Sequence, residues 1–185
     1  MPIALHSSAL TVLEQWVPPT AAQAALRDRY VAHLRAEPLG VLRECYPDHL
    51  TASTLVLDAQ HRHVLLTLHR KARRWFQLGG HVEQGDGTLP DAALREATEE
   101  SGIAGLFLDR VPVQLSAHPV PFCDPRGGVT HLDVRFVATA PPGAEHAVSA
   151  ESLDVAWWPV DGLPDPEPDV VELVQLGLAR VGRAK

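Results

Sequence analysis

The spacing of apolar positions along the chain predicts an alternation of strands and helices. Six short segments combine β-branched or aromatic residues with a period near two, which is typical of strands. They lie at residues 52–58, 63–68, 75–78, 106–115, 131–140 and 155–159. Three segments have the spacing of helices, at residues 20–35, 88–102 and 169–181. Strands interleaved with helices in this way predict an α/β sandwich.

The second of these helices is marked at both ends by residues that favour helix termini. Thr88 and, three residues later, Asp91 form a capping-box pattern. Pro90 lies in the first turn, where its missing N–H does no harm. Gly102 suits the left-handed position that usually ends a helix. The sequence therefore predicts both boundaries of this helix.

Three glutamates gather on one side of the same helix. Glu96, Glu99 and Glu100 stand at positions i, i+3 and i+4, so at about 100° per residue they point the same way. Arg95 relieves only part of their mutual repulsion. A solvated acidic surface would explain the charges alone, but not their combination with the preceding Gly79-Gly80 loop, the helix cap, Arg95 and Gly102. Carboxylate oxygens suit hard cations, so the segment predicts a site for Mg²⁺, with Mn²⁺ as a substitute.

Composition and charge narrow the class of protein. With 185 residues and 45% hydrophobic content, the chain can bury a substantial core as one domain. Its net charge of −7 argues against a general nucleic-acid-binding surface. Cys45 and Cys123 lack the spacing of a metal or redox pair, so we expect plain thiols in a reducing compartment. The sequence has no basic leader and no long apolar run, which predicts a cytoplasmic protein without membrane contact.

The segment Gly80 to Ile103, GHVEQGDGTLPDAALREATEESGI, resembles the box of the Nudix hydrolase family. That box is a glycine, five residues, a glutamate, seven residues and then Arg-Glu-apolar-any-Glu-Glu-any-Gly-apolar. The chain matches the second half at every position from Arg95 to Ile103. The first half departs twice, because Asp86 replaces the glutamate and one residue is inserted between it and the arginine. These departures bear on the loop and on Asp86, not on the metal-binding helix.

The resemblance implies a Nudix-like α/β/α sandwich, with a mixed sheet held between helices and the box at one end. We therefore expect a single Nudix domain over residues 1–185. Within it, residues 1–50 would form a helical N-terminal addition and residues 51–162 the Nudix core. Residues 163–185 would supply a C-terminal helix.

The resemblance also implies what the box residues do. It implies a pyrophosphohydrolase in which Mg²⁺ neutralises diphosphate oxygens and activates a water. Glu99 and Glu100 would be the principal metal ligands, and Glu96 would share metal binding or orient the water. The carbonyl of Gly79 would add a backbone ligand, which glycine permits by allowing close approach.

Other polar residues would support this site. Arg95 would orient a carboxylate, either Glu99 by helix spacing or Asp86 by loop contact. Many family members add an acid from a loop a few residues before a Trp-containing strand. Glu151 is the best candidate for that extra ligand or base, and Glu145 is the alternative. Either residue can instead be a solvated loop acid.

Candidates for substrate contact come from several predicted strands and loops. They are Arg70 and Arg74 in the basic run HRKARR, Trp75 on the next strand, His81 beside Gly80, and His131 on a later strand. Basic side chains can meet phosphates and an aromatic ring can stack on a base, but each of these residues also has a purely structural explanation. We expect specificity to come from the loop at residues 118–128 and the N-terminal helix, since loops outside a motif usually carry it.

These features together predict Mg²⁺-dependent hydrolysis of a diphosphate bond in a nucleoside-diphosphate-linked or similar small molecule. One alternative is a non-catalytic nucleotide-binding module, which the intact glutamates disfavour. Another is an enzyme like isopentenyl diphosphate isomerase, which uses a catalytic cysteine and metal-binding histidines around the box. Neither Cys45 nor Cys123 lies in such a context near Gly79-Gly80 in the sequence. The sequence leaves open the substrate, the general base, the number of metal ions and whether the chain forms the homodimer common in the family.

Overall fold

The computed structural model describes residues 2–148 and 152–183, which form four helices and seven strands. The helices are α1 (Pro2–Gln15), α2 (Ala21–Ala36), α3 (Leu89–Ser101) and α4 (Pro168–Gly182). The strands are β1 (Asp48–Leu57), β2 (His63–His69), β3 (Trp75–Phe76), β4 (Leu78–His81), β5 (Phe107–Pro119), β6 (Thr130–Thr139) and β7 (Ser152–Pro159).

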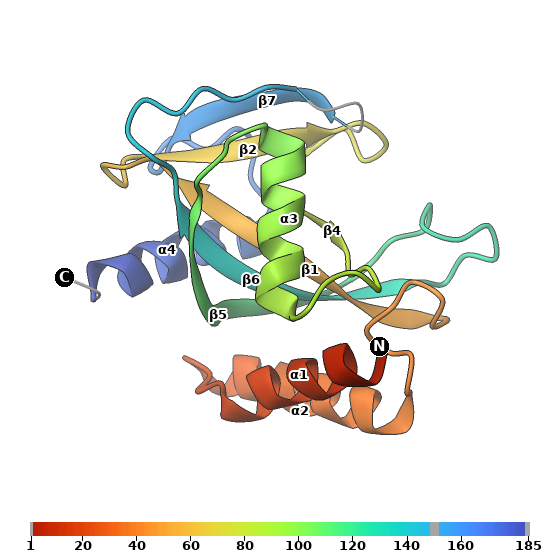
Figure 1. Cartoon of the computed structure of the whole chain (residues 1–185). Coiled ribbons are helices and arrows are strands. Elements are labelled where there is room, and N and C mark those ends of the chain that lie inside the picture. Colours follow the sequence, from red (N-terminus) through yellow and green to blue (C-terminus); the bar gives the residue numbers. More distant parts are fainter. Residues whose placement is uncertain (1, 149–151, 184–185) are drawn as a thin grey trace.

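The seven strands belong to one mixed sheet (Figure 1). Its main path runs β3-β2-β1-β6-β5, while β4 also pairs with β1 and β7 pairs with β2. The pairing of β1 with β6 is parallel and the others are antiparallel. Both faces of β1 are buried, and its apolar residues join three hydrophobic clusters: Leu50 and Ala52 one, Val56 a second, and Leu55 and Leu57 a third.

Helices cover both faces of the sheet, which confirms the predicted α/β sandwich. Helix α3 lies across one face against β1 and β4, and α4 lies on the other face against β5 and β6 (Figure 1). Gly177 lets α4 approach closely, because a Cβ there would lie 2.6 Å from Leu55 Cδ2. Helices α1 and α2 pack on each other and share a core with α3, β5 and β6.

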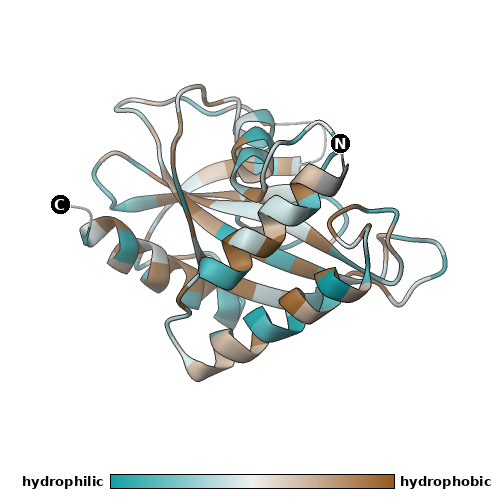
Figure 2. Cartoon of the chain, turned by 60° about the horizontal axis from the view of Figure 1, so that its bottom comes forward, coloured by the Kyte–Doolittle hydropathy of each residue, from teal (hydrophilic) through white to brown (hydrophobic). Residues whose placement is uncertain are grey.

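Helix α1 lies within the N-terminal region expected to be helical, although no separate helix is predicted above for its residues. Its buried residues follow a helical stripe at Leu5, Ala9 and Leu13, which continues to Trp16 just beyond the helix. That spacing of apolar residues is itself a sequence signal for an amphipathic helix. Figure 2 shows how hydrophobic positions recur along these helices and the strands behind them. Among the described residues, no helix combines the length and the hydropathy that a membrane crossing requires.

A polar network runs through the interior and ties the sheet to α4. The Arg135 side chain is 2% exposed and donates from Nε to Asp133 Oδ2 at 2.8 Å and from Nη2 to Asp169 Oδ2 at 2.9 Å. Asp133 also accepts from Thr51 Oγ1 at 3.0 Å and from Ser53 Oγ at 2.8 Å. This network, rather than a substrate pocket, surrounds Asp133.

Candidate functional site

The box faces a hollow of about 590 Å³. Its walls come from three stretches of chain: the segment between α2 and β1, the end of β4 with the loop that follows, and one side of α3. The lining residues are Leu42, Arg43, Glu44, Gly80, His81, Val82, Glu83, Gln84, Arg95, Glu96, Glu99 and Glu100. All three box glutamates therefore border the same space.

Helix α3 has the boundaries that its sequence predicts. Thr88 is the N-cap, and its Oγ1 accepts from the Asp91 N–H at 3.2 Å and donates to Asp91 Oδ2 at 2.7 Å. Gly102 ends the helix with φ of 69°, in the left-handed region. The caps fix the helix start and end, and so fix which residues face β4.

Gly80 is required by the close approach of β4 to α3. A Cβ on this residue would lie 2.7 Å from the carboxylate carbon of Glu96. At Gly79 a Cβ would lie 2.3 Å from Ser53 Cβ, because β4 pairs with β1 at this point. Two glycines thus let strand, helix and carboxylate meet without side chains between them.

Arg95 connects several residues of the box through hydrogen bonds. Its guanidinium binds Asp86 through two hydrogen bonds, Nε to Oδ1 at 3.0 Å and Nη2 to Oδ2 at 3.1 Å. It also donates to Glu96 Oε1 at 3.0 Å, to Glu99 Oε2 at 3.2 Å and to the carbonyl of His81 at 2.9 Å. These bonds raise the pKa of Arg95, led by the hydrogen bond to Asp86. Arg95 therefore contacts both of its expected carboxylate partners, Glu99 and Asp86.

Asp86 stabilises the loop despite the inserted residue. Its side chain is 6% exposed, and its Oδ2 also accepts from the Glu83 N–H at 2.8 Å. The Asp86 N–H returns a bond to the Glu83 carbonyl at 3.0 Å. A shorter acid in a tight turn thus still reaches the arginine.

The three glutamates differ in their surroundings. Glu100 is 8% exposed and accepts from the Gly79 N–H at 2.8 Å. The Glu99 side chain is 60% exposed and the Glu96 side chain 15%. Oxygen donors of this kind, open to one hollow and held on a capped helix, fit a hard cation such as Mg²⁺.

The other sequence candidates occupy various places. Arg70 donates to the Ser152 carbonyl at 3.0 Å, and Arg74 forms an ion pair with Glu167 before α4. Trp75 packs edge-on against Trp158, with ring centroids 5.3 Å apart. None of Arg70, Arg74 and Trp75 lines the hollow at the box, and their contacts give them structural roles. Glu151 lies outside the described residues, and Glu145 is exposed.

The loop at residues 120–129 reaches the basic run. The rings of Phe122 and His69 are stacked with centroids 5.6 Å apart, and Lys71 Nζ lies 5.7 Å from the centre of the Phe122 ring. Arg43, which lines the hollow, donates to the Cys123 carbonyl at 2.9 Å. The loop that we expected to govern specificity therefore connects the basic run to the rim of the hollow.

His81 and His131, both candidates for substrate contact, lie together beside the hollow. Burial lowers the pKa of His81 to about 4 and that of His131 to about 3, and the shifts are increased by His49 and Arg43 near the first ring and by neighbouring histidines near the second. Both imidazoles are therefore neutral at pH 7. A neutral ring supplies no positive charge to a phosphate, but it keeps a free nitrogen lone pair.

Cys123 has a histidine neighbour that its sequence spacing does not reveal. No disulfide joins Cys45 and Cys123, as expected, and both are buried. Cys123 Sγ lies 3.4 Å from His81 Nε2, directly beside Gly80. Sequence spacing could not reveal this contact, because 42 residues separate the two side chains. The argument against an isomerase from missing Cys-His context therefore does not hold.

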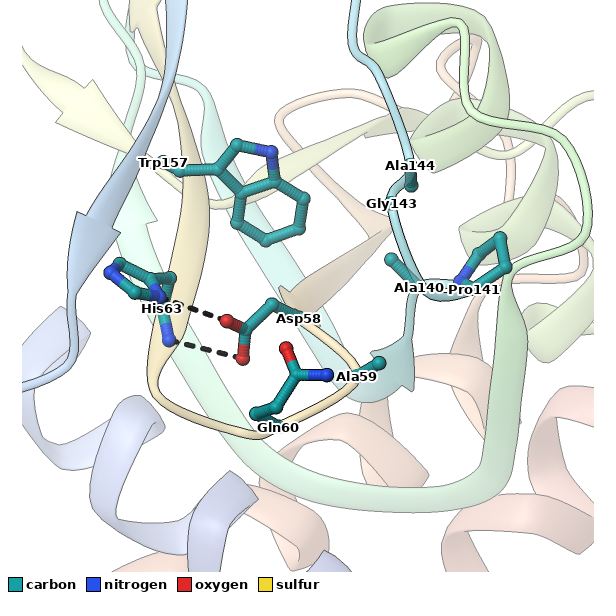
Figure 3. A pocket seen from close by; sticks show the side chains of 9 residues that line it. All are labelled: Asp58, Ala59, Gln60, His63, Ala140, Pro141, Gly143, Ala144 and Trp157. Carbon is teal, nitrogen blue, oxygen red and sulfur yellow. Dashed lines mark hydrogen bonds and ion pairs between the residues drawn. The ribbon is translucent and has the colours of Figure 1, made fainter.

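A second hollow, of about 330 Å³, lies at the turn between β1 and β2 (Figure 3). The Trp157 ring borders it opposite the loop at residues 140–144, and Asp58 points in from the turn (Figure 3). Asp58 binds His63 Nδ1 at 2.8 Å and accepts from the Arg62 N–H at 2.7 Å. These contacts make Asp58 a turn-stabilising residue, and no box residue lines this hollow.

Comparison with known structures finds similar folds. A NUDIX-family hydrolase from Clostridium perfringens aligns with TM-score 0.59 and 22% identity over 72% of this chain and 97% of its own. An Ap4A hydrolase from C. elegans gives 0.61 and 17% over 72% and 98%. The NUDIX domain of Shewanella oneidensis NrtR, complexed with ADP ribose, gives 0.56 and 18% over 75% and 92%. Among curated protein sequences, none matches this chain.

The family assignment comes from the sequence itself. The sequence model of the NUDIX domain matches residues 47–175, which is most of the chain. The match begins just before β1 and includes the whole box. With its fold, its box and this match in agreement, the protein belongs to the Nudix hydrolase family.

Proposed function

We propose that this protein hydrolyses a diphosphate bond in a nucleoside-diphosphate-linked small molecule with the help of Mg²⁺. The observation that carries the proposal is the common hollow bordered by Glu96, Glu99 and Glu100. Glu99 and Glu100 would be the main ligands of the cation, with Glu96 and the Gly79 carbonyl as further oxygen donors. Mn²⁺ prefers the same kind of ligand and would substitute.

The roles of the protein groups follow from their contacts. A bound divalent cation would neutralise diphosphate oxygens and make a water more acidic. Asp86 binds Arg95, and Arg95 in turn binds Glu96 and Glu99. Arg95 therefore acts as a positioning residue for these two glutamates. Glu96 and Glu151 are the candidates to accept a proton from the water. Arg43, which lines the hollow, and Lys71, which lies over Phe122 of the 120–129 loop, would attract the substrate's negative charge.

The substrate class can be narrowed by experiment. Similar structures include an Ap4A hydrolase and a domain complexed with ADP ribose, so dinucleoside polyphosphates and ADP-ribose belong in the first screen. Nucleoside triphosphates, nucleotide sugars and coenzyme A complete it. We expect release of a phosphorylated product with Mg²⁺ or Mn²⁺ and none after exhaustive chelation.

The decisive variants are Glu99→Gln and Glu100→Gln, which keep the size of each side chain and remove its charge. We expect each to lower kcat by roughly 100-fold or more, because a neutral amide binds the cation less well than a carboxylate does and loss of one group that stabilises the developing charge costs about that much. Glu14→Gln, on the exposed side of α1 and away from the hollow, is the matched control and should retain full activity. Full activity in both box variants would refute hydrolysis at this site.

An isomerase assay tests the alternative enzyme class, because Cys123 lies beside His81. Isopentenyl diphosphate would be incubated with the protein and the products separated. Conversion to an isomer without release of phosphate, together with no turnover in the nucleotide screen, would favour the isomerase alternative. Binding of nucleotides without turnover of any substrate would favour the binding module.

A further inference from the structure

Three histidines and one cysteine from four different elements converge beside the box. They are His49 on β1, His81 on β4, Cys123 in the 120–129 loop and His131 on β6. One ligand atom from each can be chosen so that all four lie within 4.8 Å of one another. Within the described parts of the chain, this is the one group of histidines, cysteines and acids whose ligand atoms come so close together.

The strand register explains how these residues meet. In the parallel pairing of β1 with β6, His49 and His131 are direct partners. In the antiparallel pairing of β1 with β4, His81 lies opposite Thr51, two residues along β1 from His49. Residues two apart on a strand share a face, so the rings gather on one side of the sheet. Their centroids are 5.0 to 5.2 Å apart.

The loop brings the fourth group over these rings. The Val120 N–H donates to the Val129 carbonyl at 2.8 Å, which closes the loop, and the Cys123 N–H donates to the Val120 carbonyl at 3.1 Å. Tyr46 Oη also donates to the Gly127 carbonyl at 3.1 Å. These contacts hold the thiol in place, and Cys123 is only 9% exposed.

The distances around the sulfur fit a tetrahedral metal site. Cys123 Sγ lies 3.3 Å from His131 Nε2, 3.4 Å from His81 Nε2 and 3.9 Å from His49 Nε2. With metal–nitrogen bonds of about 2.0 Å and a metal–sulfur bond of about 2.3 Å, a tetrahedron has nitrogen–sulfur edges of about 3.5 Å. Small side-chain movements would bring all four atoms to one ion.

Hydrogen bonds to the sulfur hold the group only weakly, since a thiol is a weak donor and a weak acceptor. His49 Nδ1 lies 3.1 Å from the Cys45 carbonyl, so it donates there and its Nε2 must be an acceptor. Three Nε2 atoms surround the Cys123 sulfur, so one can accept from the S–H group and the other two can only donate weak N–H···S bonds. A cation would use the lone pairs of all four atoms, and a histidine whose other nitrogen donates to a carbonyl is typical of metal ligands.

We propose that His49, His81, Cys123 and His131 bind one zinc ion as a structural site. Imidazole and thiolate ligands select Zn²⁺ over Mg²⁺, and four protein ligands make a closed site with no open position. The thiol proton would be released to solvent as the ion binds. The bound ion would hold the 120–129 loop against β4 next to Gly80. This site is separate from the oxygen-ligand site of the glutamates, and it does not depend on the proposed hydrolysis.

Cobalt substitution tests the proposal on the unaltered chain. The purified protein would be stripped with a chelator and titrated with Co²⁺ while its absorption spectrum is recorded. We expect one Co²⁺ per chain at this site, with a thiolate-to-cobalt charge-transfer band, intense visible bands of tetrahedral cobalt, and displacement by an equimolar amount of Zn²⁺. Co²⁺ bound only to the box glutamates would give no thiolate-to-cobalt charge-transfer band. That spectrum, or no tight zinc binding, would overturn the proposal.

Variants then assign the ligands. Cys123→Ser should abolish the charge-transfer band, and His131→Ala should weaken zinc binding at least tenfold. Cys45→Ser and His63→Ala are matched controls, because neither side chain belongs to the convergent group and His63 instead pairs with Asp58. Both controls should bind one zinc with unchanged affinity, and a charge-transfer band that persists in Cys123→Ser would disprove ligation by that sulfur. Circular dichroism would verify folding, and if a variant does not fold, the wild-type cobalt spectrum still decides.

Discussion

Gly80 illustrates how one residue without a side chain can shape a site. The sequence marks it as the first position of the box, but not what it makes room for. The structure supplies the reason, which is the Glu96 carboxylate 2.7 Å from the place of a Cβ. Asp86 is a second case, since its bonds to Arg95 give a role to the residue that departs from the family pattern.

Gly80→Ala should therefore damage catalysis more than folding. The added methyl would push Glu96 out of place, and a displacement of about 1 Å at a reacting centre can lower kcat by roughly 100-fold. Gly85→Ala is the control, because nothing lies within 4 Å of a Cβ at that position. Steady-state kinetics on the best substrate of the screen would measure both. Equal activity in the two variants would show that Glu96 placement does not matter.

At the scale of elements, α3 could be read from the chain almost in full. Its N-cap, its proline and its terminal glycine are all local signals, and each has the predicted place. The helix predicted at residues 20–35 is confirmed as α2, with Thr20 as its N-cap. Strand β4 was harder, because Gly79 and Gly80 lower strand propensity and only the pairing with β1 makes them part of a strand.

Thr88→Ala tests the cap. The variant loses the bond to the Asp91 N–H and should reduce the free energy of unfolding by about 1 kcal/mol. Thr88→Ser keeps a hydroxyl in the same place and should restore most of the loss. Urea denaturation followed by circular dichroism gives both values. If serine and alanine are equally destabilising, the lost hydroxyl bond is not the cause.

At the scale of the whole molecule, Arg135 links parts that are distant in sequence. Its partners Asp133 and Asp169 belong to β6 and α4, and Gln114 Oε1 on β5 accepts a further bond at 2.9 Å. A strand pattern predicts that residues alternate between faces, but not that an arginine will be buried among partners from three elements.

Arg135→Leu should be strongly destabilising. It leaves Asp133 buried without its cation, and breaking a buried pair in this way costs about 3 to 5 kcal/mol. Arg180→Leu removes a pair with Asp109 in which the arginine side chain is 41% exposed, so it should cost no more than about 1 kcal/mol. Thermal and urea unfolding of the two variants would compare them. A loss below that of Arg180→Leu would contradict the importance of the buried network.

The sequence by itself determined the family, the sandwich class and the acidic face of α3, because box spacing, helix caps and periodicity are all local. Only the tertiary structure decided which distant groups meet. It placed Arg43 at the hollow, gave Arg70, Arg74 and Trp75 other partners, and brought Cys123 to the histidines. Such contacts depend on strand register and loop closure, which arise when the whole chain packs and leave no periodic trace in the sequence.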